Sequence, residues 1–174
     1  MGSIDEALLA NAKYARDFSI AKLAMLPARK LAIIACMDAR LSIEPMLGLK
    51  TGDAHIIRNA GGIVSEDALR SLLISHYLLG TNEFMIINHT DCGMLTFKDD
   101  DFRYRLERET GTASVSPEQF HSFSDLEENV RRQVKKVRSH PWIPQSIAVR
   151  GFVYDVKTGR LNEVAVERAA GADD

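Results

Sequence analysis

Residues 30–40 read Lys-Leu-Ala-Ile-Ile-Ala-Cys-Met-Asp-Ala-Arg, and the expected architecture is built around them. The first part, residues 31–35, is an uninterrupted apolar run of strand length, typical of a strand that is buried on both faces. Cys36, Asp38 and Arg40 follow at every second position, so an extended chain would point all three side chains to the same side. A thiol, a carboxylate and a guanidinium are costly to desolvate without a function. The end of this strand is therefore the first candidate site.

A second candidate site follows another apolar run. Residues 84–87 (Phe-Met-Ile-Ile) form a short strand candidate, and Asn-His-Thr-Asp-Cys-Gly follows at positions 88–93. His89 and Cys92 make a His-x-x-Cys pair where this strand would end. A long helical pattern precedes the run, and the order strand–helix–strand implies a parallel crossover. If the two strands are parallel neighbours, Cys36, His89 and Cys92 gather at their carboxyl ends, where open α/β sheets place their sites.

The combination of side chains favours a zinc site. Two thiolates and one imidazole suit tetrahedral zinc, and three protein ligands leave the fourth position free for water. Cys36 and Cys92 are also the only cysteines in the chain. Other interpretations stay open: an inert core cysteine, a coincidental His-x-x-Cys pair, or a Cys36–Cys92 disulfide, which would suit an oxidising compartment. The presence of Asp38 and Arg40 favours the metal. Asp91, which lies between two ligands, could contact the ligand residues or simply form the turn, and it is interpreted as a turn residue.

Cys-x-Asp-x-Arg followed by His-x-x-Cys resembles the β-class carbonic anhydrase family. The resemblance runs from about Leu31 through Gly93 and includes Gly52-Asp53 and Arg-Asn-Ala-Gly at 58–61. It implies an α/β fold with a central, mostly parallel β-sheet flanked by helices. It also implies a zinc lyase, a carbonate dehydratase, in which zinc-bound hydroxide converts carbon dioxide reversibly to bicarbonate. Family members are built from dimers, so the resemblance further implies a homodimer or a higher homo-oligomer.

Asp38 and Arg40 are the expected catalytic pair. Asp38 comes two residues after a ligand, where it can accept a hydrogen bond from water in the fourth zinc position. Arg40 can hold that carboxylate by a bidentate contact and keep it ionised. The resemblance implies that this Asp–Arg pair is a signature of the family, and that the aspartate takes the fourth zinc position in some inactive members. Gly61 and Gly62, after a second strand at 54–58, are expected to line the approach of a small substrate to the metal.

Two other functions are compatible with the same residues. Some proteins similar to β-class anhydrases hydrolyse carbonyl sulfide or carbon disulfide, linear molecules that the same hydroxide can attack. A non-catalytic regulatory module that binds zinc or bicarbonate would keep the site without turnover. The intact Asp38–Arg40 pair speaks against that module.

Composition limits the remaining possibilities. The chain has 174 residues, 45% apolar and 26% charged, which predicts one globular domain over residues 1–174 with an N-terminal helical arm at 1–20. The net charge of -2 argues against a nucleic-acid surface or a polybasic membrane patch. No apolar run approaches the ~20 residues that a membrane span needs. The opening sequence Met-Gly-Ser-Ile-Asp-Glu lacks the pattern of a secretory signal, so we expect a cytoplasmic protein.

Three further patterns complete the expected fold. An amphipathic helix over residues 4–18 is expected to reach across to a partner chain. Ser-Asp-Leu-Glu at 124–127 is a capping-box pattern that predicts an N-cap at Ser124 and a helix with an apolar stripe. Residues 146–156 form the last core strand, and a Thr-Gly turn leads into residues 161–166, which predicts a C-terminal hairpin at the sheet edge.

Overall fold

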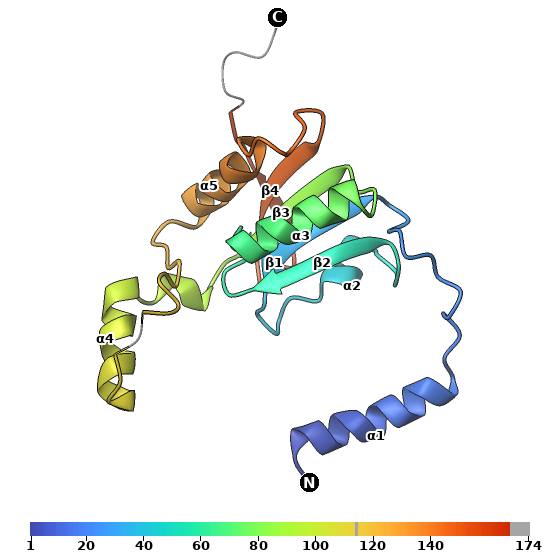
Figure 1. Cartoon of the computed structure of the whole chain (residues 1–174), viewed down its shortest axis with the longest axis horizontal. Helices are drawn as coiled ribbons and strands as arrows, with labels where there is room; N and C mark the ends of the chain where they lie inside the picture. Colours follow the sequence, from blue (N-terminus) through green and yellow to red (C-terminus); the bar gives the residue numbers. More distant parts are fainter. Residues whose placement is uncertain (114, 168–174) are drawn as a thin grey trace, which may run out of the picture.

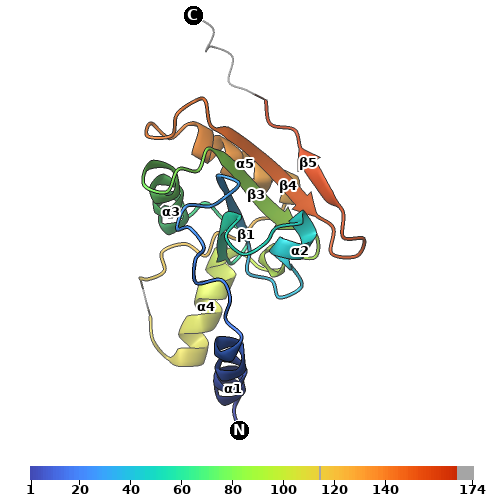
Figure 2. The same ribbon diagram turned by 90° about the vertical axis from the view of Figure 1, so that its right-hand side faces the viewer.

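The computed structural model describes residues 1–113 and 115–167 of the chain. Its core is a five-stranded β-sheet with the strand order β2-β1-β3-β4-β5 (Figures 1 and 2). Strands β1 to β4 pair in parallel, and β5 pairs antiparallel to β4. The mostly parallel α/β sheet and its edge hairpin are therefore confirmed. The predicted domain of residues 1–174 includes positions 114 and 168–174, which lie outside the described residues.

The elements in chain order are α1 (Ser3–Arg16), β1 (Leu31–Cys36), α2 (Ile43–Leu47), β2 (Ala54–Asn59), α3 (Glu66–Tyr77), β3 (Glu83–His89), the 3₁₀ turn η1 (Gly93–Leu95), α4 (Asp99–Thr110), α5 (Leu126–Arg138), β4 (Ala148–Tyr154) and β5 (Leu161–Val164).

Strand β1 lies in the middle of the sheet because both of its faces are apolar. Ala32 and Ile34 belong to one apolar cluster, and Ile33 and Ala35 belong to a second cluster on the opposite face. All four side chains are fully buried. Alternating side chains of a strand point to opposite faces, so this strand must be covered on both sides.

Helices α3 and α5 cover one face of the sheet (Figure 1). A Cβ atom at Gly151 of β4 would overlap with the side chains of Val130 and Val134 on α5. Glycine at this position therefore lets α5 pack directly onto β4. The N-cap of α5 is Asp125, whose carboxylate accepts a hydrogen bond from the N–H of Glu128 at 2.9 Å. The predicted N-cap at Ser124 is wrong by one residue, because aspartate at 125 makes this capping contact itself.

The opposite face carries shorter segments. Leu41, Ile43 of α2, Met94 of η1 and Phe123 pack there against β1 and β3. These short segments lie beside the carboxyl ends of the central strands, where the candidate site is found.

Helix α1 lies away from the sheet in both views (Figures 1 and 2). It has no buried residue, and its apolar side chains are mostly exposed to solvent. Within the described part of the chain, no helix is long and apolar enough to cross a membrane.

Candidate metal centre

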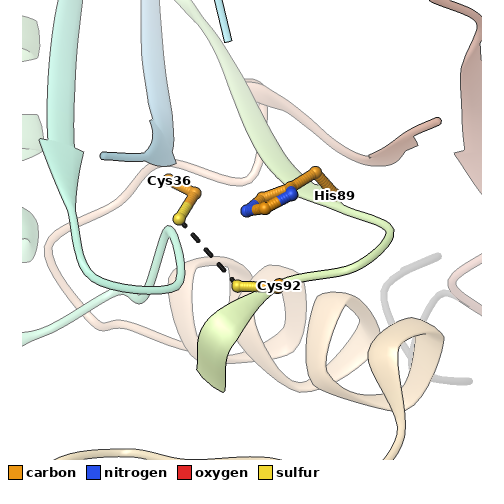
Figure 3. Close-up of side chains that lie close together, drawn as sticks. All are labelled: Cys36, His89 and Cys92. Carbon is orange, nitrogen blue, oxygen red and sulfur yellow. Dashed lines mark hydrogen bonds between the residues drawn. The ribbon is translucent and has the colours of Figure 1, made fainter. Parts of the chain in front are cut away.

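The parallel pairing of β1 with β3 brings the three candidate ligands together. Cys36 is the last residue of β1, His89 is the last residue of β3, and Cys92 follows in the turn after β3. Their side chains converge at this edge of the sheet (Figure 3). The two sulfur atoms are 4.0 Å apart, and the ligand atoms of all three residues lie within 4.8 Å of one another. The structure thus places the predicted ligands in one buried cluster, with both cysteines free rather than joined in a disulfide.

The imidazole of His89 is oriented as a metal ligand. Its Nδ1 lies 2.9 Å from the carbonyl oxygen of Thr90, which can only accept, so Nδ1 carries the proton. In the neutral imidazole, which is the form that binds a metal, Nε2 then presents a lone pair toward the two sulfur atoms. Among the described residues it is the one buried side-chain nitrogen or oxygen without a hydrogen-bond partner. A buried lone pair without a partner is costly, and a cation held by this nitrogen and two sulfurs would satisfy it. The donor set therefore fits zinc.

The two thiols share one hydrogen bond and so favour one negative charge. The hydrogen bond from the Cys92 thiol lowers the pKa of Cys36 to about 4, and the neighbouring His89 side chain and the backbone N–H groups of Asp38 and Gly61 contribute to the same effect. The pKa of Cys92 is raised well above its ordinary value, because that thiol serves as the donor to Cys36 and is buried. The buried pair therefore favours a single negative charge, and a bound cation would supply the charge that favours ionisation of the second thiol.

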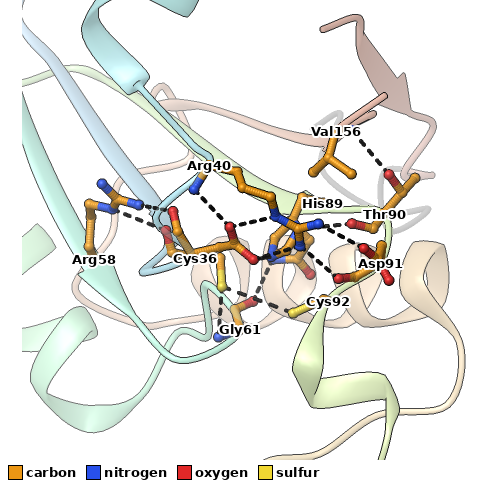
Figure 4. Close-up of polar contacts among 11 residues, drawn as sticks. Cys36, Arg40, Arg58, Gly61, His89, Thr90, Asp91, Cys92 and Val156 are labelled. Carbon is orange, nitrogen blue, oxygen red and sulfur yellow. Dashed lines mark hydrogen bonds and ion pairs between the residues drawn. The ribbon is translucent and has the colours of Figure 1, made fainter. Parts of the chain in front are cut away.

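Asp38 and Arg40 form an ion pair beside the cluster. Figure 4 shows Arg40 next to His89 and Asp91. Oδ1 of Asp38 accepts hydrogen bonds from the backbone N–H and from Nε of Arg40, each at 2.9 Å, and Oδ2 accepts from Nη2 at 2.8 Å. The Arg40 guanidinium holds the pKa of Asp38 well below its usual range. Oδ2 of Asp38 also lies 3.7 Å from Nε2 of His89. An ionised carboxylate therefore stands directly beside the position that the ligands surround.

The contacts that two further residues make at this site were not predicted from the sequence. Asp91 is a turn residue with a φ of 55°, as expected, but its carboxylate also accepts a hydrogen bond from Nη1 of Arg40 at 2.7 Å. Arg58 donates to the carbonyl oxygens of Cys36 at 3.0 Å and Asp38 at 2.6 Å, and so fixes the chain after β1. The position of Asp91 between two ligands in the sequence did indicate that it could lie at the site. Arg58 was part of the family resemblance at 58–61, but its contacts were not predicted, because a charged residue at a strand end is usually solvated.

Gly61 and Gly62 lie against the Cys36 ligand. The N–H of Gly61 donates a hydrogen bond to Sγ of Cys36 at 3.3 Å. Gly62 has a φ of 61°, and a Cβ atom there would lie 2.8 Å from the carbonyl oxygen of Ile87 and 3.0 Å from the backbone nitrogen of Cys36. Both glycines thus contact the ligand strands, while their role in the approach of substrate stays a prediction.

Replacing Gly62 with alanine should lower the free energy of unfolding by roughly 2 kcal/mol or more, from a left-handed backbone and steric overlap together. Gly80→Ala is the matched control, since Gly80 has a φ of 76° with no atom within 4 Å of its Cβ position. Urea unfolding should show a clearly smaller decrease in the free energy of unfolding for Gly80→Ala than for Gly62→Ala. Equal losses in the two variants would show that Gly62 is not tightly packed.

Known proteins resemble this chain over most of its length. The sequence model of the family described as carbonic anhydrase matches residues 31–161. β-Carbonic anhydrase 1 of Mycobacterium tuberculosis is 49% identical over 161 residues, which cover 92% of this chain and 96% of that protein. A carbonic anhydrase from Streptococcus mutans superposes with a TM-score of 0.89 at 42% identity, covering 95% of this chain and 99% of its own. A carbon disulfide hydrolase from Acidithiobacillus thiooxidans is 35% identical over 151 residues, 76% of each chain.

The matched region contains all three residues of the buried cluster, and both the sequence and the fold agree with carbonic anhydrases of known structure. The similarity covers two thirds or more of both chains in each of these relatives. The chain therefore belongs to the β-carbonic anhydrase family.

Proposed function

We propose that this chain catalyses the reversible hydration of carbon dioxide to bicarbonate with a zinc ion held by Cys36, His89 and Cys92. One observation carries the proposal: the unpartnered Nε2 of His89 faces two buried sulfurs, with the ionised Asp38 beside it. A relative that is 49% identical is a β-carbonic anhydrase, which supports the choice of reaction.

Zinc, when bound, would act as a Lewis acid that lowers the pKa of a water molecule to near neutral pH. The chain's own groups then orient the nucleophile. Oδ2 of Asp38 lies 3.7 Å from Nε2 of His89, near enough to accept a hydrogen bond from a water or hydroxide at the ligand cluster. Because the pKa of Asp38 is held low, the carboxylate stays an acceptor at neutral pH. Asp38 would thus orient a water or hydroxide at the cluster so that its oxygen lone pairs face carbon dioxide.

Arg40 acts as the positioning residue for Asp38. It occupies both carboxylate oxygens of Asp38 and is held from the other side by the carboxylate and the carbonyl oxygen of Asp91. Bidentate contacts of this type fix the plane of a carboxylate as well as its charge. The exposed Asp91 contributes little to stability, because solvent screens exposed ion pairs. Its role is to orient the Arg40 guanidinium.

The substrate is tested by parallel assays on one zinc-loaded preparation. Stopped-flow measurement of carbon dioxide hydration should give the highest kcat/KM. Hydrogen sulfide release from carbonyl sulfide and carbon disulfide should be slower by orders of magnitude. Faster release of sulfide would assign the chain to the activity of its carbon disulfide hydrolase relatives instead. No turnover of any of the three substrates would favour a regulatory module.

The proposed assembly is a homodimer in which α1 packs against the partner chain. Ile4, Leu8 and Leu9 are exposed by 77%, 63% and 55%, although they are apolar. An isolated helix of 14 residues is marginal in water, so packing is expected to stabilise it. A second copy supplies a surface of the right kind, because each chain would then cover the helix of the other.

Sedimentation should therefore give a species of twice the chain mass of 19.4 kDa. Replacing Leu8 and Leu9 with glutamate should shift the protein toward monomer, because charges would then be buried at the contact. Ala10→Glu adds a charge to the opposite, exposed face of the same helix and should leave the dimer intact. An active wild-type monomer would contradict this assembly.

A cytoplasmic location completes the proposal. Cys36 and Cys92 must stay reduced to bind a metal, and their sulfur atoms are only 4.0 Å apart. A reducing compartment keeps such a pair as thiols rather than as a disulfide.

A further inference from the structure

Three buried amide side chains form a connected chain behind the ligand cluster. Asn88 on β3 and Asn129 and Gln133 on α5 are exposed by 0%, 1% and 5%. Amide groups are costly in an apolar core unless their donors and acceptors are satisfied. Neither the ligand motif nor the proposed reaction uses these residues, yet they connect helix α5 to the turn beside the ligand Cys36.

The chain of hydrogen bonds begins at helix α5 and ends at the glycine turn. Nε2 of Gln133 donates to Oδ1 of Asn129 at 3.0 Å, and Nδ2 of Asn129 donates to Oδ1 of Asn88 at 2.7 Å. Nδ2 of Asn88 then donates to the carbonyl oxygens of Gly61 and Gly62, at 2.8 Å and 3.2 Å. Helix α5 is thus joined through two asparagines to the turn that contacts Cys36.

The direction of this chain is fixed at both ends. The carbonyl oxygens of Gly61 and Gly62 only accept, so the amide nitrogen of Asn88 must face them. At the other end, the backbone N–H of Val64 donates to Oε1 of Gln133 at 2.9 Å. A guanidinium N–H of Arg132 donates to Oδ1 of Asn129 at 2.7 Å. Reversing any one amide would set two acceptors or two donors against each other, so the network has a single arrangement.

The turn that the network holds delivers a hydrogen bond to the metal ligand. Anchoring the carbonyl groups of Gly61 and Gly62 fixes the backbone next to the N–H of Gly61, which donates to Sγ of Cys36 at 3.3 Å. A hydrogen bond to a thiolate ligand withdraws charge from the sulfur and so changes how strongly it donates to a metal. The position of this one N–H therefore affects how strongly the Cys36 sulfur donates charge to a bound metal.

We propose that Asn88 and Asn129 are positioning residues for the metal: they hold the Gly61 N–H on the Cys36 sulfur and so set the strength of the sulfur–metal bond. The inference rests on the proposed function, because it requires Cys36 to be a ligand. Helix α5 then belongs to the metal site as well as to the core. Any change that moves α5 relative to β3 should alter the properties of the bound metal.

Asn88→Asp tests the inference. The substitution keeps the size of the side chain but sets a carboxylate oxygen against the carbonyl groups of Gly61 and Gly62, which should push the turn away from Cys36. The probe is Co²⁺ added to the metal-free full-length protein, followed by its thiolate-to-cobalt charge-transfer absorption. We expect the band to move to lower energy. Competition with a chromophoric chelator should also show zinc binding weakened by about 10- to 100-fold, because the displaced turn would no longer hold the Cys36 ligand in its orientation.

Thr81→Val is the matched control for loss of a buried hydrogen bond. Thr81 is fully buried, and its hydroxyl bonds to the hydroxyl of Ser75 at 2.8 Å, in a cluster that reaches no metal ligand. The control should lower the melting temperature and leave the cobalt band and the zinc affinity at the wild-type values. If Asn88→Asp does not fold, Asn129→Asp tests the same network at the residue that donates to Asn88. Its new carboxylate oxygen would face Oδ1 of Asn88, so the hydrogen bond would be lost.

The outcomes separate the inference from the proposed function. A wild-type protein that binds Co²⁺ without a thiolate band would overturn both, because Cys36 would not be a ligand. A wild-type thiolate band that stays unchanged in energy and affinity in the folded asparagine variant would overturn the positioning role alone. A band shift in Asn88→Asp or Asn129→Asp, absent in Thr81→Val, supports it.

Discussion

Replacing Cys92 with serine is expected to remove most of the zinc from the protein and to abolish the hydration of carbon dioxide. A serine hydroxyl does not ionise near neutral pH and is a poor ligand for zinc compared with a thiolate. The remaining ligands, Cys36 and His89, would leave two positions to solvent. Metal analysis after dialysis against a chelator should fall from about one zinc per chain to a small fraction of that value.

Asp91→Asn is the control for this loss, because it changes the same turn without altering a ligand atom. Its carboxylate contacts Arg40 and not the cluster, so zinc content should stay near one per chain. Circular dichroism on both variants verifies that each is folded. Full zinc occupancy in a folded Cys92→Ser protein would rule out this set of ligands.

The second large effect is expected from Asp38→Asn, which should keep zinc and lose rate. The three ligands are untouched, but the amide cannot serve as the charged acceptor that orients the nucleophile. Loss of one positioned polar group of this kind typically lowers kcat by on the order of 10²-fold or more. Arg40→Ala should have a similar effect, because Asp38 would lose the contacts that fix its plane.

A matched pair elsewhere in the chain provides the control. Asp53 pairs with Arg29 at 3.2 Å, and the side-chain exposures of this pair (18% and 52%) are close to those of Asp38 and Arg40 (19% and 47%). Asp53→Asn should therefore lower the free energy of unfolding with no loss of kcat. If Asp38 only supported the loop after β1, both variants would lose stability while the folded enzyme kept its rate. A folded, zinc-loaded Asp38→Asn enzyme with full activity would contradict the assigned role.

The low pKa of Asp38 also fixes the sign of a pH effect on stability. Folding lowers this pKa because the Arg40 guanidinium favours the charged carboxylate. The ion pair therefore stabilises the native state above the ordinary aspartate pKa of about 4, and that stabilisation is lost as the pH falls below it. The activity of the wild type, by contrast, should rise with pH as water ionises, since Asp38 is already charged throughout that range.

The sequence predicted the central sheet and the ligands because both depend on simple local patterns. An apolar run such as residues 31–35 admits few positions other than a central strand, and ligands placed at strand ends must meet if the strands are parallel. Asp125 instead of Ser124 as the N-cap shows the limit of such patterns, because two adjacent residues both had suitable side chains.

Other contacts could not be found from the sequence, since they depend on geometry between distant segments. Arg58 meets the backbone of Cys36 and Asp38 only because β2 and β1 pair in one register. Asn129 and Gln133 lie beside apolar positions of α5 and gave no sign that they would be buried next to Asn88. Asp91 was recognised as a turn residue, but its contact with Arg40 requires the folded arrangement of two loops.

The central claim is that zinc in the Cys36–His89–Cys92 cluster performs the hydration of carbon dioxide. Titrating the metal-free protein with zinc, and following the stopped-flow hydration rate at each addition, tests this claim most directly. The rate should rise linearly and level off at one zinc per chain. A metal-free protein that is fully active, or a protein that binds one zinc and hydrates carbon dioxide no faster than buffer, would contradict it.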